Sequence, residues 1–429
     1  MPNALVRCVG AYTNNPPTGA MRGFGAVQSC FAYEAQIDRL AKAVGLDPIE
    51  IRALNGLHEG DATITSQPMI GSAPVPEIVR RCAAIPAPDD EPEDVMTLPG
   101  GAGNLARRAD VVRGVGYAAG FKNVCYSHGF DDPSTARVRV LRDERGVLAR
   151  VHTAAAEVGQ GVVAVCAQIA RTELRIERVE IDTPDTSIDS AGSTSASRQT
   201  WMTGSAVMLA ARAARAELER RAAERGRRLE EIDLGDLLDE PIDEVVTYRH
   251  RATEPLNDVT QNQGHVAFLF AAHRAVVDVD PETGLVKVVQ IATAQDVGKA
   301  INPAAVIGQI EGGIAQGLGL AVMEEVQLRD GKVLNPSFTD YLLPTILDMP
   351  PVVADVIEHP HPDAPYGAKG VGEPPTISST PAIVAAIREA TGRTLNRVPV
   401  RPDDIVFGNV ARSGWQVEPG ADPRGARRA

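Results

Sequence analysis

The chain has 429 residues, of which 44% are apolar, so it can bury a large core and form more than one domain. Its 56 acidic and 43 basic residues give a net charge of -13, which argues against a non-specific nucleic-acid binder. The five cysteines lie far apart without a CxxC pair, which excludes a disulfide scaffold and a cysteine-built zinc or iron–sulfur site. No apolar run of bilayer length and no secretory signal stand out, so we expect a soluble, cytoplasmic protein with no membrane segment.

The first half of the chain predicts helices, then a linker, then a hairpin. Apolar residues recur at helical spacing over 32–54, where Gly45 and Pro48 punctuate the pattern. Prolines and acidic residues crowd the segment 85–108, which predicts a solvated linker. Alternating valines over 138–151, interrupted by a Gly turn, predict a β-hairpin.

The second half predicts three more helices and a second hairpin. The segment 202–232 has Ala on one side and Arg and Glu on the other, which is typical of a helix with a solvated charged face. A hairpin is expected over 267–291, and a glycine-rich helix over 303–325. A further helix is expected over 379–391, with Ser or Thr as its cap, and a frayed tail over 411–429.

These elements favour an α+β protein with mixed sheets and packed helices. The composition divides the chain into a first unit at 1–84, the linker at 85–108, a second unit at 109–410 and the tail at 411–429.

Several stretches are rich in Gly and small polar residues. They are 14–25, 156–161, 192–198, 306–313 and 367–375. Such stretches expose backbone N–H groups, which favour anions where a helix begins. Together they predict a cradle for a polar, phosphorylated cofactor.

The stretch from Gly159 to Ala164 fits G-x-G-x-x-A, follows a predicted strand and opens a predicted helix. An acid, Asp182, ends the next strand, as in dinucleotide-binding units. A nicotinamide site and a ligand-free tight turn both remain open at this point.

Three side chains are candidates for chemistry. Glu373 stands in a Gly-Val-Gly-Glu-Pro-Pro segment, where a carboxylate in a tight, partly dry site can act as a general base. Arg22 could bind an anionic or carbonyl-bearing substrate while Phe24 stacks on a ring. A solvated loop glutamate and a structural arginine are the alternatives. The run 359–363, His-Pro-His-Pro-Asp, lacks a third ligand at recognisable spacing and predicts an exposed loop.

The ordered set of motifs resembles the molybdopterin-binding large subunit of the xanthine dehydrogenase and aldehyde oxidase family, and bacterial xanthine dehydrogenase subunits in particular. The resemblance covers most of the chain, from about residue 3 to 407. It is carried by 14–25, 159–161, 296–303, 308–312 and 370–375.

The resemblance implies a molybdenum hydroxylase acting on a purine-type heterocycle such as hypoxanthine or xanthine. It makes Glu373 the catalytic base, Arg22 the residue that orients the substrate and Phe24 the residue that stacks on its ring. The residues that it assigns to the cofactor are Gly159, Gln160, Gly161, Thr194, Ser195, Ala196, Ser197, Arg198 and Gln309.

The implied cofactor is molybdenum–molybdopterin, in its simple or cytosine dinucleotide form, with the metal held by the pterin dithiolene and by no protein ligand. An iron–sulfur subunit and an FAD subunit are the implied partners in an oligomer. The upstream half of the family's large subunit has no counterpart in these residues, so a split-subunit half or an inactive fragment is an alternative. An NAD-binding oxidoreductase and an aldehyde oxidase-type enzyme also remain open, and the sequence does not fix the substrate.

Overall fold

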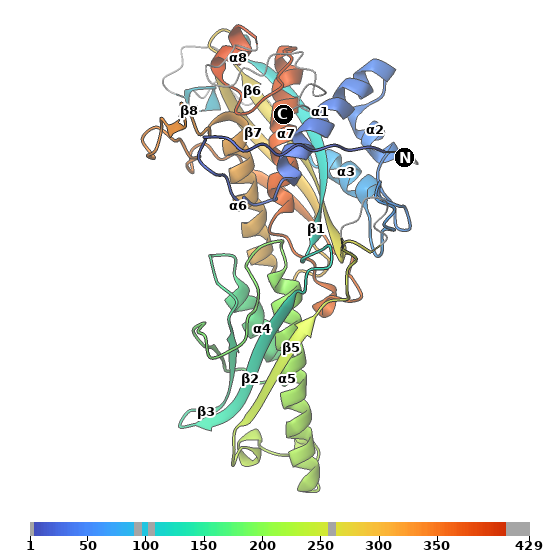
Figure 1. Cartoon of the computed structure of the whole chain (residues 1–429), viewed down its shortest axis with the longest axis vertical. Coiled ribbons are helices and arrows are strands. Elements are labelled where there is room, and N and C mark those ends of the chain that lie inside the picture. The colour runs from blue at the N-terminus through green and yellow to red at the C-terminus, as the bar shows by residue number, and fades with distance from the viewer. Residues whose placement is uncertain (1–3, 90–96, 102–107, 256–262, 409–429) are drawn as a thin grey trace, which may run out of the picture.

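The computed structural model describes residues 4–89, 97–101, 108–255 and 263–408. In these ranges the chain forms two bodies, each a four-stranded sheet covered by helices (Figure 1). The α+β class expected from the sequence is confirmed. The centre of the predicted linker, at 90–96 and 102–107, and the predicted tail lie outside the described residues.

The larger body is built on a sheet with the strand order β1–β6–β7–β10. These strands are β1 Val112–Val124, β6 Ala267–Val279, β7 Val286–Asp296 and β10 Val352–Ile357. β6 pairs antiparallel with both β1 and β7, and β10 joins β7 in parallel. The predicted hairpin at 267–291 is therefore confirmed as β6 and β7. A two-strand hairpin of β8 Leu328–Arg329 and β9 Lys332–Val333 lies outside this sheet.

Helices cover both faces of this sheet. They are α1 Ala26–Val44, α2 Pro48–Leu54, α3 Val75–Ala84, α6 Pro303–Val322, α7 Pro374–Thr391 and α8 Pro402–Val406. Side chains of β6 point alternately to the two faces of the sheet. On one face they pack in a hydrophobic cluster with Ile387 of α7, and on the other face in a cluster with Ile78 of α3. The two helices therefore lie on opposite faces. α7 lies directly on β1, because a Cβ on Gly116 would be 2.2 Å from the Ala386 nitrogen. Because helices cover both faces, β6 is buried along nearly its whole length, including its polar residues His273, Arg274 and Asp278.

The smaller body is inserted between β1 and β6, two strands that pair with each other (Figure 1). Its elements are β2 Pro133–Asp143, β3 Gly146–Thr153, α4 Val162–Leu174, β4 Val179–Ile181, α5 Gln199–Glu224 and β5 Ile242–Arg249. The strand order is β4–β3–β2–β5, with β2 and β3 forming the hairpin predicted over 138–151. The side chains of Val138 and Val151 pack with Ile169 of α4 and Ala210 of α5.

α5 has the two faces that its sequence predicts. Ala206, Ala210 and Ala214 are fully buried on one side. On the exposed side, Arg220 forms ion pairs with Glu217 at 2.7 Å and with Glu224. Exposed pairs of this kind contribute little stability, so the buried alanine face holds the helix in place.

Several predicted helix ends are wrong, each for a local reason. The break expected at Gly45 and Pro48 is present, because Gly45 takes a left-handed conformation with φ of 68° and Asp47 caps the helix that starts at Pro48. The first helix, however, begins at Ala26, ahead of the predicted segment 32–54. The helix expected over 202–232 ends at Glu224. The helix expected to start at Ser379 with a Ser or Thr cap starts five residues earlier, at Pro374.

α6 is the one helix of the described ranges that is long and apolar enough to cross a bilayer. Its glycines instead pack against α7. A Cβ on Gly313 would be 2.5 Å from the Pro375 Cβ, and one on Gly317 would be 1.9 Å from the Ser379 Oγ. The helix therefore has the close packing of a core helix in a globular protein.

The α6–α7 contact predicts a difference between two glycines of the same helix. Gly313→Ala should lower the free energy of unfolding by about 1–3 kcal/mol, because the rigid Pro375 ring cannot make room. Gly308→Ala is the matched control: nothing lies within 4 Å of its Cβ, and it should stabilise by up to about 1 kcal/mol. Urea unfolding of both variants measures this, and equal stabilities would contradict the packing described.

Candidate active site

Glu373 lies where the bodies meet, at the residue that precedes α7. Its side chain is buried, with 7% of the residue exposed. Oε2 accepts a hydrogen bond from the Ser197 hydroxyl at 3.0 Å, and Oε1 accepts one from the Gly23 N–H at 3.3 Å. The Ser197 Oγ in turn accepts from the Glu373 N–H at 3.0 Å. A carboxylate oxygen has two acceptor positions, so both oxygens keep the capacity to take up a proton.

Small residues let the segment that contains Glu373 lie close to the Ser197 loop. A Cβ on Gly370 would be 2.0 Å from the Ser197 carbonyl oxygen, so only glycine fits there. Pro374 and Pro375 follow Glu373 and start the helix without needing N–H partners. The Gly-Val-Gly-Glu-Pro-Pro segment thus fixes the carboxylate against the loop of Ser197.

Arg22 reaches the same place from the loop ahead of α1. Its Nε donates to the Gly372 carbonyl, and its Nη2 donates to Gln309 O at 2.9 Å and to Gln309 Oε1 at 3.3 Å. Burial lowers the pKa of Arg22 and the charge of Glu373 opposes that shift, while a guanidinium remains protonated in either case. Phe24 is 70% exposed, with a left-handed φ of 45°. The structure therefore brings together Arg22, Gln309 and Glu373, whereas the Phe24 ring faces outward.

The loop 194–198 is held by a buried cation. The Arg198 guanidinium is fully buried and pairs with Asp132 at 2.5 Å. Ala196 and Ser197 both have left-handed φ values, 50° and 51°. Across the ranges described, no hydrogen bond takes up the N–H groups of Ala196 and Ser197, whereas those of Ser195 and Arg198 donate within the loop. This loop therefore offers free donors directly beside Glu373.

The Gly159–Gly161 turn ends in the predicted helix, which is α4, after the strand β3. The carboxylate of Glu157 accepts from the N–H groups of Gly159 at 2.8 Å, Gly161 at 2.9 Å and Val163 at 3.1 Å. Partial burial opposes the shift, but these N–H groups lower the pKa of Glu157. The protein's own carboxylate thus occupies the position that a dinucleotide pyrophosphate would need.

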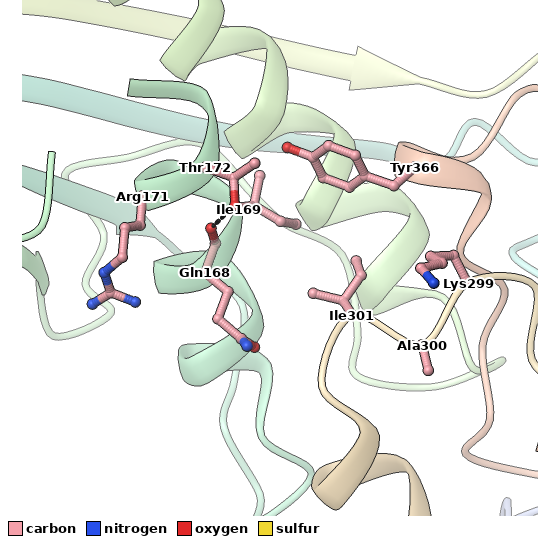
Figure 2. Close-up of a pocket in the computed structure, with 8 residues that line it drawn as sticks. All are labelled: Gln168, Ile169, Arg171, Thr172, Lys299, Ala300, Ile301 and Tyr366. Carbon is pink, nitrogen blue, oxygen red and sulfur yellow. Dashed lines mark hydrogen bonds between the residues drawn. The ribbon is translucent and has the colours of Figure 1, made fainter. Parts of the chain in front are cut away.

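Gln160 and Gln309 line one small cavity of about 50 Å³, between α4 and α6. The Gln160 amide folds back onto its own loop, where Nε2 donates to Ala156 O at 2.9 Å. The cavity shares Lys299 and Ile301 with a wider hollow of about 440 Å³. Figure 2 shows the segment 299–301 facing the residues of α4 that line this hollow, beside Tyr366.

Comparison with known proteins identifies the family of this chain. The family model described as "Molybdopterin cofactor-binding domain" covers residues 102–350, and a second model with the same description covers residues 1–56. The chain belongs to the molybdopterin cofactor-binding domain family. The resemblance found from the sequence motifs is thereby confirmed.

Relatives of this molybdopterin-binding family align over nearly the whole chain. The "Xanthine dehydrogenase molybdenum-binding subunit" of Escherichia coli is 30% identical over 91% of this chain and 53% of its own length. The structure of aldehyde oxidoreductase from Desulfovibrio gigas superposes with a TM-score of 0.73 at 29% identity, covering 90% of this chain and 41% of that one. Quinoline 2-oxidoreductase from Pseudomonas putida 86 gives a TM-score of 0.75 at 26% identity, covering 91% and 52%. The chain spans about half the length of the curated relatives it matches.

The sequence reasoning missed Lys122, which lies on β1 in this molybdopterin-binding fold. Its Nζ is 3.6 Å from Glu373 Oε2, and 7% of the residue is exposed. A signal was present, because Lys122 alternates with Ala118, Gly120 and Val124 on the buried face of the strand. A lysine on the apolar face of a predicted strand therefore pointed to a buried partner.

The exposed-loop prediction for 359–363 is wrong at His361. That residue is 2% exposed, and its ring lies 4.8 Å from the Trp201 ring. Burial lowers the pKa of His361. The neighbouring His359 contacts Glu77 at 2.8 Å. Packing between the bodies explains this burial.

The Glu157 contacts predict a pH-dependent stabilisation. The folded pKa is lowered, so the carboxylate stabilises the fold above the unfolded pKa of about 4.3 and loses that effect as pH falls through the folded pKa. Glu157→Ala should therefore cost about 0.5–1 kcal/mol near neutral pH, at the low end for a cap because the side chain is exposed.

Urea unfolding between about pH 7 and pH 3 measures this effect, and the cost should be constant near neutral pH and shrink below about pH 4.3, as pH falls through the folded pKa. Glu177→Ala is the control, since the Glu177 carboxylate makes no hydrogen bond or ion pair with any described residue. A pH-independent cost for Glu157→Ala would contradict the capping role.

Proposed function

We propose that this chain forms the cofactor-binding part of a molybdenum hydroxylase that oxidises an electron-poor carbon of a purine-type heterocycle, such as hypoxanthine or xanthine. The observation that carries this proposal is the buried Glu373 carboxylate, fixed by Ser197 and Gly23 beside the Arg22 guanidinium. A base, a cation and a set of free N–H donors converge there, which is the arrangement expected for proton abstraction from a nucleophile.

The described residues fit the expected molybdenum–pterin cofactor. The free N–H groups of Ala196 and Ser197 would serve its polar atoms, and Gln160 and Gln309 flank a cavity beside them. The adjoining hollow of about 440 Å³ falls in the size range of ligand pockets and would take the outer end of a longer form, such as a cytosine dinucleotide. When bound, the cofactor supplies the centre that accepts two electrons from the substrate.

The protein side chains supply the remaining chemistry. Glu373 accepts a proton at its carboxylate and so activates the oxygen that attacks the ring. Arg22 orients the substrate ring and stabilises the negative charge that develops on the ring. The described hydrogen bonds of the Arg22 guanidinium go to neutral carbonyl oxygens, so its positive charge forms no ion pair with a described carboxylate. Phe24, whose ring is exposed in this structure, would stack on the substrate ring after turning toward the site. The Escherichia coli relative is named as part of a xanthine dehydrogenase, which favours a purine substrate.

The chain is proposed to act in an assembly. The chain spans about half the length of its relatives, and the proposed assembly contains the remaining part of the large subunit together with an iron–sulfur subunit and an FAD subunit. Large apolar side chains stand exposed on one segment, with Phe338 at 81%, Ile346 at 86% and Leu347 at 76%. An exposed apolar segment of this kind favours a protein partner.

Replacing the proposed base tests the function. Glu373→Gln in the assembled enzyme should lower the turnover number by about 10²–10⁴-fold, because the amide cannot take up the proton. Molybdenum and pterin content should stay unchanged. Glu389→Gln, the same substitution on the exposed part of α7, is the control. Turnover near the wild-type rate in Glu373→Gln would end the assignment.

The need for partners predicts a second result. The purified chain alone should show no xanthine-dependent dye reduction, whereas co-expression with the missing large-subunit portion and the two electron-transfer subunits should restore it. Molybdenum and pterin content, measured in both preparations, reports assembly independently of turnover. Activity and about one molybdenum in the chain alone would show that the partners are dispensable.

A further inference from the structure

Two cations share one carboxylate at the candidate site. Lys122 forms an ion pair with Glu373, at 3.6 Å, and its Nζ also donates to Asn123 Oδ1 at 2.7 Å. Arg22, whose charge also acts on Glu373, donates only to the neutral carbonyl groups of Gly372 and Gln309 among its described contacts. The site therefore carries one positive charge in excess.

Among the described residues, Glu373 is the one carboxylate that forms an ion pair with Lys122, and none forms an ion pair with Arg22. The neighbouring His265 adds no further positive charge at physiological pH, because burial, together with the charges of His128, Lys122 and Arg251, lowers its pKa to about 4. Burial also lowers the pKa of the Lys122 amine, and the charge and hydrogen bond of Glu373 oppose this shift. A buried cation in excess is costly unless an anion joins it.

We infer that Lys122 is a specificity-determining residue that favours heteroaromatic substrates bearing an anionic oxygen, either a ring carboxylate or an ionised ring oxygen. The inference rests on the proposed function and narrows its substrate class. Lys122 and Arg22 approach Glu373 from different elements, β1 and the loop before α1, so a substrate held by Arg22 can present its anionic group to Lys122. The negative charge of the substrate then offsets the one positive charge that Lys122 and Arg22 carry in excess of Glu373.

Equilibrium binding of two probes of the same shape tests this inference. Nicotinate carries a carboxylate where nicotinamide carries a neutral amide. The assembled wild-type enzyme should bind nicotinate about tenfold more tightly than nicotinamide in calorimetric titration. In Lys122→Met the ratio should fall below about threefold while nicotinamide still binds, and Lys122→Arg should restore most of the preference.

The controls separate this inference from a structural role and from the proposed function. Lys332→Met removes an exposed lysine and should leave the ratio unchanged. A wild-type enzyme without preference, or an equal loss of both probes in Lys122→Met with an unchanged melting temperature, would overturn the inference and leave Lys122 as a partner that only positions Glu373. Failure of the proposed function would appear separately, as an assembled enzyme that contains molybdenum but turns over no heterocycle.

Discussion

The candidate site depends on burying one carboxylate among groups from distant parts of the chain. Gly23, Lys122 and Ser197 each contact Glu373, and they come from the loop before α1, from β1 and from the smaller body. A buried carboxylate is costly unless such partners are present, so the two bodies and the N-terminal helices must be assembled for this site to exist. The glycines that let backbones approach, such as Gly370, make that assembly sterically possible.

Glu157 and Glu373 both stand in Gly-rich turns ahead of helices, and their settings differ. Glu157 is exposed and accepts N–H groups of its own loop, so its contacts are local and serve α4. Glu373 is buried and accepts from residues more than 170 positions away, which leaves it beside two cations. A similar position in a Gly-rich turn therefore gives a structural cap in one place and a candidate base in the other. The difference lies in which segments pack against each turn.

The insertion of the smaller body between β1 and β6 places the site. Because these strands pair along their whole length, the chain must leave the larger sheet after Val124 and return at Ala267 beside it. The loop of Ser197 is brought to the end of β1 by this arrangement, where the Cys125 N–H donates to the Ala196 carbonyl at 3.1 Å. The free N–H groups, the two glutamines and the base consequently lie around one junction.

The sequence by itself determined the α+β class, both hairpins and the motifs that identify the family, because strand alternation and turn residues are local properties. It also singled out Glu373, Arg22 and Gln309, whose roles stay predictions. The predicted helix ends were wrong where a single residue decides the position at which the helix begins, as Pro374 does for α7. Hydrophobic periodicity alone does not mark such a residue. Only the tertiary structure decided that Glu157 fills the G-x-G turn, that His361 is buried, and that Lys122 reaches Glu373. The burial of His361 and the approach of Lys122 to Glu373 depend on contacts between residues far apart in the chain, and no spacing in the sequence encodes such a distance. The Glu157 contacts are local, but they depend on the conformation of the turn, which the G-x-G pattern alone does not specify.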